Sequence, residues 1–401
     1  MGLNDTPVSE RVHIAFFGCR NAGKSSLVNA VTGQTVSVVS DVKGTTTDPV
    51  KKTMELLPIG PVVIIDTPGI DDEGNLGELR VERTKDILRQ TDVAVLVCDS
   101  TVGMSEADSE LLKYFADNRV PYVIAMNKSD LIDSAEAKSE NTLFVSAING
   151  SGINELKEKI ASFAKKNTEE KHIISHLISH GDVVVLVIPI DESAPKGRLI
   201  LPQQQTLREI LDSSCTAICC QPDELKGTLA ALSVKPKLVV TDSQVFGKVS
   251  KDVPEDILLT SFSILFAGYK GDLETLVGGA AKLSKLKSGD KVLISEGCTH
   301  HRQCNDIGTV KMPGWIRNFT GVEPEFEFTS GGQFPGDLSK YALIVHCGGC
   351  MLNEKEMMSR IEMAKSAGVP IVNYGVAIAH MHGILCRSLE AFPGALCILA
   401  N

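Results

Sequence analysis

The chain has 401 residues, more than one hydrophobic core usually supports, which predicts two or three domains. No apolar run is long enough to cross a membrane as a helix, and the polar N-terminus shows no signal peptide, so we expect a cytoplasmic protein without membrane attachment. The net charge of −10 disfavours nucleic-acid binding, and eleven cysteines without an export signal are expected as thiols or metal ligands rather than disulfides.

Strands and helices alternate through the first 165 residues. Val12–Phe17 is a short apolar run that precedes a glycine-rich turn. Val62–Asp66, Val93–Asp99 and Tyr122–Asn127 are apolar runs that each end in a polar residue, and helical stretches such as Glu106–Asn118 lie between the strands. This alternation predicts a doubly wound α/β domain with a mostly parallel sheet, in which ligands bind at the carboxyl ends of the strands.

The rest of the chain is predicted to form two smaller α/β domains, at residues 175–263 and 264–401, after a charged linker at Lys165–Lys171. Strands are expected at Asp182–Ile190, Thr216–Cys220, Lys237–Thr241, Lys291–Ile294, Tyr341–Val345 and Pro370–Asn373, and helices at Pro202–Asp212, Asp272–Lys287 and Glu354–Ala367.

The segment Gly18–Ser25 (GCRNAGKS) fits the phosphate-binding pattern G-x-x-x-x-G-K-[ST]. It follows a predicted strand and opens a predicted helix, which is the context that this motif requires. Its backbone N–H groups can surround phosphates, Lys24 can neutralise the β- and γ-phosphates, and the Ser25 hydroxyl can bind Mg²⁺. We predict a P-loop whose nucleotide-binding residues are Gly18, Asn21, Ala22, Gly23, Lys24, Ser25 and Ser26.

Two further segments complete the predicted phosphate end of the site. Asp66–Gly69 (DTPG) ends a strand, where the Asp66 carboxylate can hold Mg²⁺ through water and the Gly69 amide can meet the γ-phosphate. Thr46, in the segment GTTTD at residues 44–48, is expected as the switch threonine that caps Mg²⁺. The predicted activity is GTP hydrolysis, with a catalytic set of Lys24, Thr46, Asp66 and Gly69.

The base end is predicted from the segment Asn127–Asp130 (NKSD), which contains Lys128. The Asp130 carboxylate can accept hydrogen bonds from guanine N1 and the exocyclic amine, which adenine cannot donate. This selects GTP over ATP, because an unpaired carboxylate would be costly. Ser146 and Ala147 follow the next predicted strand, Leu143–Val145, and supply the remaining base contact.

Cysteine and histidine gather at two positions in the C-terminal region. Cys298 and His300 form a C-x-H pattern after one predicted strand, and His346–Cys350 (HCGGC) follows another. Strand ends of one sheet can converge, so Cys298, Cys347 and Cys350 with His300 or His346 form a plausible metal site.

Three interpretations of these residues remain open. A closed Cys₃His site would suit structural zinc. A [4Fe–4S] cluster on three thiolates would leave one iron for a histidine, a carboxylate, water or an exchangeable ligand, with Cys304 and Asp306 as nearby spare groups. The cysteines could also be core residues with a coincidental C-x-x-C spacing.

The N-terminal region resembles the GTPases of the TrmE/Era type. Asn21 lies three residues before Lys24, where potassium-activated members of that group carry an asparagine, so the resemblance implies a K⁺ ion held by Asn21. Residue 70 is Ile, so the water-positioning Gln of Ras-type proteins is absent. Asp72 and Glu73 are candidates for orienting the water only through their nearness in sequence.

A potassium-type GTPase followed by C-x-H and H-C-x-x-C resembles the HydF family, the GTPase and scaffold of [FeFe]-hydrogenase maturation. The closing segments Asn373–Ala377 and Met381–Gly383 belong to this similarity. The resemblance implies a [4Fe–4S] cluster on Cys298, Cys347 and Cys350 with a labile fourth ligand, and His300 and His346 match the histidines of the family.

The same resemblance implies a middle dimerisation domain, and hence a homodimer. It also implies a di-iron precursor, bearing CO and cyanide, that is assembled with two radical-SAM partners and passed to apo-[FeFe]-hydrogenase. GTP and GDP, Mg²⁺, K⁺ and the cluster are the implied cofactors.

Two other functions compete with this hypothesis. An RNA-modification or ribosome-assembly GTPase with a zinc site is disfavoured by the net charge of −10 and by the absence of a basic, aromatic-rich C-terminal module. A redox switch, in which a cluster reports oxidation to the GTPase, would require the GTP turnover rate to depend on the cluster.

Overall fold

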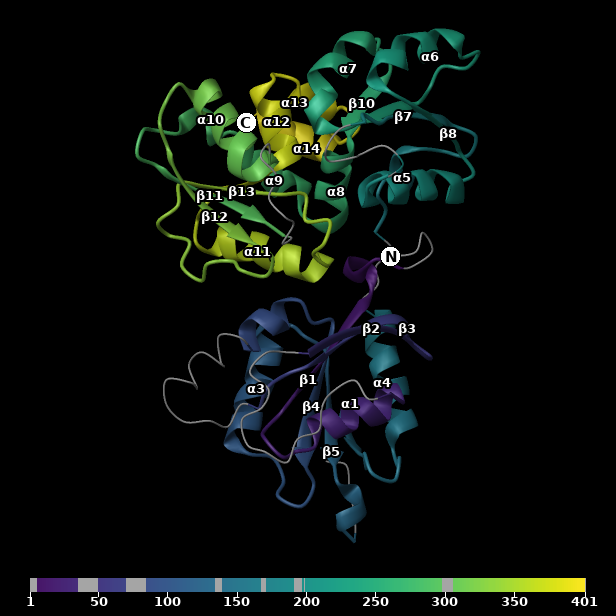
Figure 1. Cartoon of the computed structure of the whole chain (residues 1–401), viewed down its shortest axis with the longest axis vertical. Helices are drawn as coiled ribbons and strands as arrows, with labels where there is room; N and C mark the ends of the chain where they lie inside the picture. The colour runs from purple at the N-terminus through teal and green to yellow at the C-terminus, as the bar shows by residue number, and fades with distance from the viewer. Residues whose placement is uncertain are drawn as a thin grey trace. The chain divides into compact units, whose positions relative to one another are not determined.

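Within the residues that the structure describes, the apolar runs form the centres of three sheets (Figure 1). The computed structural model describes residues 6–34, 50–69, 84–133, 139–166, 171–190, 197, 199–297 and 306–400. Two compact units, Met1–Glu170 and Lys171–Asn401, divide the chain. Among the described residues, no helix combines the length and the apolar character that a bilayer span needs.

The first unit contains a six-stranded sheet in the order β2-β3-β1-β4-β5-β6. Only β2, at its edge, runs antiparallel to its neighbour among the described strands. The strands are β1 (Val12–Phe17), β2 (Val50–Leu56), β3 (Gly60–Asp66), β4 (Val93–Asp99), β5 (Tyr122–Asn127) and β6 (Thr142–Phe144). The helices are α1 (Lys24–Thr32), α3 (Glu106–Asp117) and α4 (Ile153–Lys166), and residues 84–89 are also helical.

Alternate residues of these strands enter two separate cores, as a sheet covered on both faces requires. Ile14 and Phe16 of β1 pack with residues of α1 and α4, whereas Ala15 and Phe17 pack with residues of α3. Continuous apolar strands of this kind are typical of a parallel sheet between two helical layers. The predicted doubly wound P-loop fold is confirmed.

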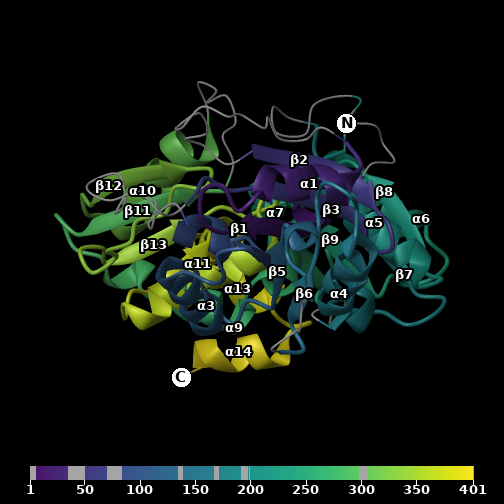
Figure 2. The same cartoon turned by 90° about the horizontal axis from the view of Figure 1, so that it is seen from below.

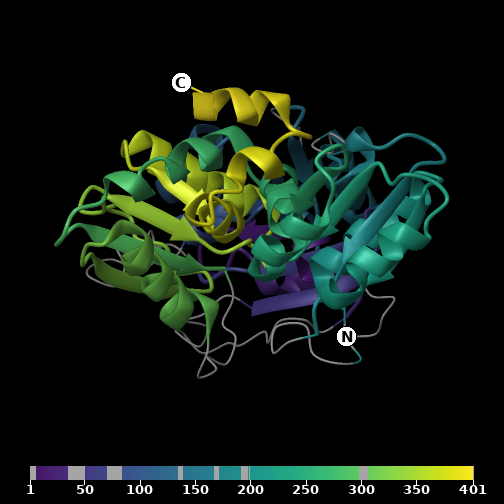
Figure 3. The same cartoon turned by 90° about the horizontal axis from the view of Figure 1, so that it is seen from above.

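The second unit contains two four-stranded parallel sheets, which Figures 2 and 3 show from two further directions. One has the order β10-β9-β7-β8 and the other β12-β11-β13-β14. Their strands are β7 (Val183–Val187), β8 (Thr216–Cys220), β9 (Leu238–Thr241), β10 (Leu258–Ser261), β11 (Lys291–Glu296), β12 (Glu325–Ser330), β13 (Leu343–His346) and β14 (Ile371–Asn373).

Helix α8 (Phe262–Lys270) contributes to the cores of both sheets: Phe262 and Phe266 pack on the first, and Ile264 and Ala267 on the second. The other helices are α5 (Leu201–Asp212), α6 (Leu225–Ala231), α7 (Phe246–Asp252), α9 (Leu273–Ala280), α10 (Met312–Thr320), α11 (Glu354–Ser366), α12 (Tyr374–Met381), α13 (Leu385–Ser388) and α14 (Pro393–Ala400). Because α8 is shared, the predicted boundary at residue 263 falls inside one packed unit and stays a prediction.

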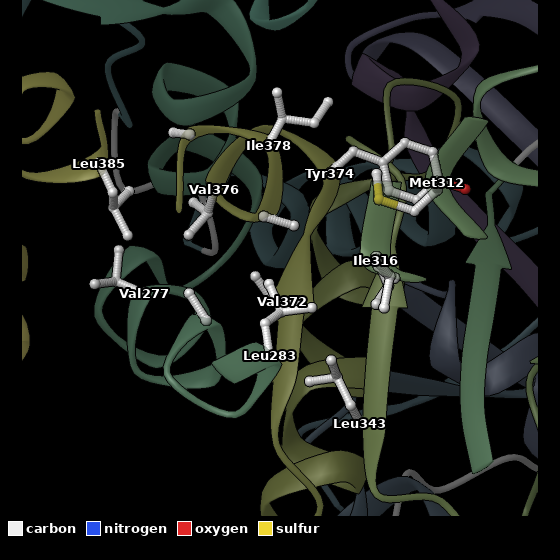
Figure 4. Packing of buried hydrophobic residues seen from close by; sticks show 14 of the residues in the cluster. Val277, Leu283, Met312, Ile316, Leu343, Val372, Tyr374, Val376, Ile378 and Leu385 are labelled. Atoms are coloured by element: carbon white, nitrogen blue, oxygen red, sulfur yellow. The ribbon is translucent and has the colours of Figure 1, made fainter. Parts of the chain in front are cut away.

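The second sheet also has a core on each face. On one face, side chains of β13 and β14 meet those of α9, α10 and α12, and Figure 4 shows Leu343, Val372, Ile316 and Val277 among them. On the other face, Leu293, Ile344 and Ile371 pack against α11. This packing fixes the direction in which the ends of β11 and β13 project.

The prediction of one helix over Asp272–Lys287 is wrong at its C-terminal end. Helix α9 ends at Ala280, and a separate 3₁₀ turn covers Leu283–Lys285. A Cβ on Gly279 would lie 1.9 Å from the Ile371 carbonyl oxygen, so the end of α9 lies against the backbone of β14. The sequence pattern also missed β2, β10 and β12, which are short strands or lie at sheet edges.

Candidate functional site: a nucleotide site and a cysteine site

The phosphate-binding loop connects β1 to α1. Gly18 and Gly23 have φ angles of 139° and 87°, which L-residues with side chains rarely adopt. A Cβ on Gly18 would lie 2.2 Å from the Val97 carbonyl oxygen, and a Cβ on Gly23 would lie 2.3 Å from Asn127 Nδ2. The loop therefore needs glycine at both positions to lie this close to β4 and β5.

Lys24 is the first residue of α1, and it is only 8% exposed. Its Nζ atom donates hydrogen bonds to the carbonyl oxygens of Gly18, at 2.9 Å, and Cys19, at 2.7 Å. These carbonyls hold the ammonium group within the loop, at the amino end of the helix. The oxygens of a bound phosphate would therefore contact a buried positive charge and a helix N-terminus at the same place.

Ser25 and Asp66 form the candidate Mg²⁺ site. The Ser25 hydroxyl donates to Asp66 Oδ2 at 2.7 Å, so the two residues predicted to bind Mg²⁺ lie next to each other. In the part of the chain that the structure describes, Asp66 Oδ1 is buried and has no hydrogen-bond partner. A hydroxyl beside a carboxylate with a spare buried oxygen fits a hard divalent cation, which prefers oxygen ligands. Thr46 lies outside the described residues.

Gly69 brings the end of the Asp66 segment against the P-loop. A Cβ at position 69 would lie 2.5 Å from Arg20 Cγ and 3.1 Å from the Arg20 backbone nitrogen. Thr67 fixes the same segment, because both its backbone N–H and its hydroxyl donate to the Phe16 carbonyl. The predicted contact of the Gly69 amide with a γ-phosphate stays a prediction, and Ile70, Asp72 and Glu73 lie outside the described residues.

The predicted base-binding residues form a connected set. Asn127 Nδ2 donates to the Ala22 carbonyl at 3.0 Å, and Asn127 Oδ1 accepts from the Ala147 backbone N–H at 3.1 Å. The Ser146 hydroxyl donates to Asp130 Oδ1 at 2.6 Å. The amide of Asn127 thus ties the P-loop to the base end, and Ser146 orients the carboxylate that is predicted to read guanine.

Lys128 and Asn21 both adopt left-handed backbone conformations, with φ angles of 63° and 60°. Lys128 Nζ pairs with Asp99 Oδ2. Burial raises the pKa of Asp99, but hydrogen bonds from Lys128 and Thr101 outweigh this, so its pKa lies below the usual value. Asn21 is exposed and lines a cavity of 610 Å³ beside the N-terminus of α3. The predicted K⁺ contact of Asn21 stays a prediction.

The cysteine site begins where β11 and β13 end side by side. The two strands are parallel neighbours, with Ser295 opposite His346, and the Cys347 N–H donates to the Ser295 carbonyl at 2.9 Å. The chain that leaves β11 therefore starts toward Cys298 from the sheet edge that carries Cys347. Cys298, His300 and Cys304 lie outside the described residues, and no group of three or more His, Cys, Asp or Glu that could hold a metal occurs within the described part.

Backbone N–H groups surround the Cys347 sulfur. Gly297 donates to Sγ at 3.0 Å and Gly349 at 3.4 Å. Burial raises the pKa of the Cys347 thiol to about 11, although these two hydrogen bonds act in the opposite direction. Because N–H···S bonds stabilise sulfur that carries negative charge, this environment fits a metal-bound thiolate, and metal binding would release the thiol proton.

Lys270 supports the loop that carries Cys350. The ammonium, at the end of α8, is 2% exposed and donates to the carbonyl oxygens of Cys350, at 3.3 Å, and Leu352, at 3.1 Å. Burial raises the pKa of the Cys350 thiol, and the positive charge of Lys270 opposes that shift. A buried cation next to the Cys350 thiol fits a site that carries negative charge when it is loaded.

His346 is completely buried, and both of its ring nitrogens have partners. Nδ1 lies 2.7 Å from the Cys347 carbonyl oxygen, and Nε2 lies 3.0 Å from Arg360 Nη1. Burial and the neighbouring Arg360 charge lower the pKa of His346 to about 3, so the ring is neutral. In this arrangement neither nitrogen is available to a metal, and the predicted role of His346 as a fourth ligand would require the ring to leave Arg360.

Comparison with known families agrees with this geometry along most of the chain. Residues 13–128 match the 50S ribosome-binding GTPase family, residues 173–271 the hydrogen maturase F dimerization domain, and residues 274–391 the hydrogen maturase F tetramerization domain. The chain belongs to the HydF family. The matched regions give the chain a GTPase domain followed by a dimerization and a tetramerization domain of the HydF family.

Two curated relatives are GTPases that each align with about two fifths of this HydF chain. The tRNA modification GTPase MnmE of Nitrosomonas europaea is 34% identical over 162 residues, which cover 39% of this chain and 36% of that protein. GTPase Der of Kosmotoga olearia is 32% identical over 176 residues, covering 39% and 40% respectively. The chain thus spans well under half the length of these relatives. A crystal structure of a variant of Aquifex aeolicus Era bound to GDP·AlF₄⁻ aligns at 21% identity and a TM-score of 0.35, over 52% of this chain and 92% of that one.

Sequence reasoning missed two buried cations of the HydF cysteine site, Lys270 and Arg360. Arg360 lies on α11 within a stripe of buried residues at helical spacing, formed by Met357, Ile361 and Ala364. A charged residue inside such a stripe was the available signal, because buried charges need specific partners. Lys270 gave no comparable signal, since it occupies the last turn of its helix, where lysine is common.

Proposed function

We propose that this HydF-family chain is a scaffold that binds a [4Fe–4S] cluster on Cys298, Cys347 and Cys350 and regulates its partners through GTP hydrolysis. The observation that supports it best is the environment of Cys347. Two backbone N–H groups point at its sulfur, from the end of β11 and from the Gly348-Gly349 turn. β11 ends at Glu296, two residues before Cys298 in the sequence, and is the parallel neighbour of the strand that precedes Cys347.

The cargo in this proposal is a di-iron precursor that is assembled with two radical-SAM partners and passed to apo-[FeFe]-hydrogenase. Membership of the HydF family and the matches to its two oligomerization domains support this role. A homodimer through residues 173–271 is part of the proposal. Three cysteine ligands leave one iron of the cluster open to an exchangeable ligand, such as His300 or a group of the cargo.

The first experiment is iron and sulfide analysis with EPR spectroscopy on the full chain, reconstituted anaerobically and reduced with dithionite. We expect about four irons and four sulfides per chain and a spin-half signal, as a single cubane requires. Zinc at one per chain without iron uptake would overturn the cluster assignment and favour the structural zinc interpretation. The GTPase assignment would be unaffected by that result.

Delivery is tested by mixing the loaded chain with apo-hydrogenase and measuring hydrogen evolution. Cys347→Ser should abolish activation, whereas Cys219→Ser, at an exposed position of β8, should not. Equal activation by wild type and Cys347→Ser would contradict the scaffold role.

The K⁺ part of the proposal is tested by GTP turnover in KCl and in NaCl at equal ionic strength. We expect faster turnover in KCl and no difference between the salts for Asn21→Ala. Equal turnover of the wild type in the two salts would contradict the assignment of Asn21.

A further inference from the structure

Arg360 places a positive charge in the interior of the second unit. Its side chain is 1% exposed, and it is among the largest fully buried side chains of the described residues. The guanidinium lies over the ring of Phe334, with Cζ 5.1 Å from the ring centre. A buried charge persists only when hydrogen bonds and counter-charges compensate its loss of water, so each partner of this group has a physical role.

The guanidinium hydrogen bonds link four segments of the chain. Nη2 donates to Glu356 Oε1 of the same helix at 2.7 Å and to the Gly331 carbonyl, just after β12, also at 2.7 Å. Nη1 lies 3.0 Å from His346 Nε2, at the end of β13, and 3.4 Å from the Ser295 hydroxyl of β11. Arg360 therefore joins the ends of three adjacent strands to α11, directly behind the cysteine loop.

These contacts decide the tautomer of His346. Arginine can only donate, so His346 Nε2 must accept, and the ring proton of a neutral imidazole then lies on Nδ1. Nδ1 donates to the Cys347 carbonyl oxygen at 2.7 Å. A continuous series of polar contacts thus runs from Glu356 through Arg360 and His346 to the backbone of Cys347.

The position of Cys347 depends on that backbone. Its carbonyl is held by His346 and its N–H by the Ser295 carbonyl, while its sulfur accepts from Gly297 and Gly349. Rotation of the imidazole would release the carbonyl and change the direction in which the sulfur faces. In metal sites, groups that orient a ligand from behind commonly control metal affinity.

We propose that Arg360 is a positioning residue for Cys347: it fixes the Nδ1-protonated tautomer of His346 and thereby the backbone from which the cysteine sulfur projects. The inference rests on the proposed function, because it takes Cys347 as a ligand of the bound cluster. It assigns His346 a role behind the ligand rather than on the metal.

The first test needs no metal. We would label the histidines of the full metal-free chain with ¹⁵N and record their ring nitrogen shifts by NMR, assigning His346 by the signal lost in His346→Asn. We expect a single Nδ1-protonated tautomer in the wild type and a loss of that single tautomer in Arg360→Met. Arg317→Met is the matched control, because Arg317 also lies over a phenylalanine, 5.0 Å from the Phe326 ring centre, and pairs with a glutamate, but at the surface.

The second test uses the reconstituted protein and compares iron affinity and the midpoint potential of the cluster. We expect Arg360→Met to lower iron affinity by about 10-fold or more, as is typical for residues that orient metal ligands, and to shift the potential, with Arg317→Met unchanged. His346→Asn should retain more affinity than His346→Gln, because the asparagine amide nitrogen can replace Nδ1 as the donor to the Cys347 carbonyl.

Arg360→Lys covers the case in which the methionine variant does not fold. One ammonium cannot make all the contacts of the guanidinium, so we expect a mixed tautomer and reduced iron affinity in a folded protein. The proposal is overturned if His346 keeps one Nδ1-protonated tautomer in a folded Arg360 variant, or if that variant binds iron like Arg317→Met. If the wild type binds no iron at all, the proposed function fails, and the NMR result still decides the role of Arg360 toward His346.

Discussion

The nucleotide site and the cysteine site both lie at the carboxyl ends of parallel strands, but different groups hold their functional atoms. In the nucleotide site, functional side chains bond to one another or to the loop itself. Ser25 contacts Asp66, Ser146 contacts Asp130, and Lys24 contacts two carbonyls of its own loop. In the cysteine site, the backbone N–H groups of Gly297 and Gly349 donate to the Cys347 sulfur, and the buried Lys270 ammonium donates to the Cys350 carbonyl.

This difference shows how far a local motif can specify a site. A P-loop carries its own glycines, lysine and helix N-terminus within eight residues, so its geometry follows once the strand and helix are in place. The C-x-x-C segment carries the thiols and one of the two N–H groups that face the Cys347 sulfur. Its charge environment comes from Lys270 and Arg360, which lie on two different helices.

The largest expected effect comes from removing the P-loop ammonium. Lys24→Ala should reduce GTP binding or turnover by about 100-fold or more, because a buried donor to the phosphates is lost. Cluster reconstitution should be unchanged, since the cysteines lie in the other unit. The measurements are GTP turnover and iron content, with Lys159→Ala on α4 as the control. GTP turnover at the wild-type rate in Lys24→Ala would contradict the P-loop assignment.

The converse prediction, loss of the cluster without loss of GTP turnover, is tested at the cysteine site. Cys347→Ser should remove the cluster, because serine lacks the thiolate, and should leave GTP turnover within about two-fold of the wild type, since no GTP-site residue is changed. Iron content and GTP turnover are measured on the same sample, with Cys219→Ser as the control. A folded Cys347→Ser protein without GTPase activity would show that the two sites are coupled.

A change at the base end separates specificity from hydrolysis. Asp130→Asn removes the carboxylate that is predicted to accept from guanine, so GTP affinity should fall by about 100-fold, as expected for the loss of two charged hydrogen bonds. Xanthosine triphosphate should bind the variant better than GTP, because its C2 carbonyl can accept from the new amide. Competition binding gives both affinities, and Asp133→Asn, exposed three residues later, should behave like wild type.

The smallest expected effect is a pH dependence in the first unit. Burial lowers the pKa of His13 to about 4. The hydrogen bond between its Nδ1 and the Arg11 carbonyl oxygen, at 2.9 Å, acts in the opposite direction. Asp92 Oδ2 lies 3.8 Å from Nδ1 and favours protonation, but that oxygen already accepts from the His13 N–H, and burial dominates. The unfolded chain therefore takes up the proton first as the pH falls. The contribution of the neutral His13 ring to the free energy of unfolding is complete above about pH 6.5, and it is lost as the pH falls toward 4.

His13→Asn keeps a donor near the Nδ1 position and removes the titration. Between pH 7.5 and pH 5.5 the wild type should lose about 1 kcal/mol more stability than this variant. Hydrogen exchange of β1 peptides, followed by mass spectrometry, reports this locally. Equal losses in the two proteins would show that His13 is not the group that titrates.

The strand and helix pattern of the nucleotide domain was predictable because its strands are long apolar runs whose polar ends carry the motifs. The same patterns found β11 and β13, and hence the strand ends at which the cysteines are predicted to meet. Short or edge strands such as β10 and β12 gave weaker signals, because they carry fewer buried residues at a regular spacing.

The sequence by itself determined which residue types are available for chemistry: the phosphate loop, the carboxylate predicted to read guanine and the spacing of the cysteines are local features. Only the tertiary structure decided what surrounds them. Helix α9 ends against β14 at Gly279, and the His346 ring faces Arg360. Contacts between segments that are distant in the sequence determine both arrangements. A motif indicates which atoms can bind a ligand, whereas the packing of the fold determines which of those atoms are already hydrogen-bonded to other protein groups.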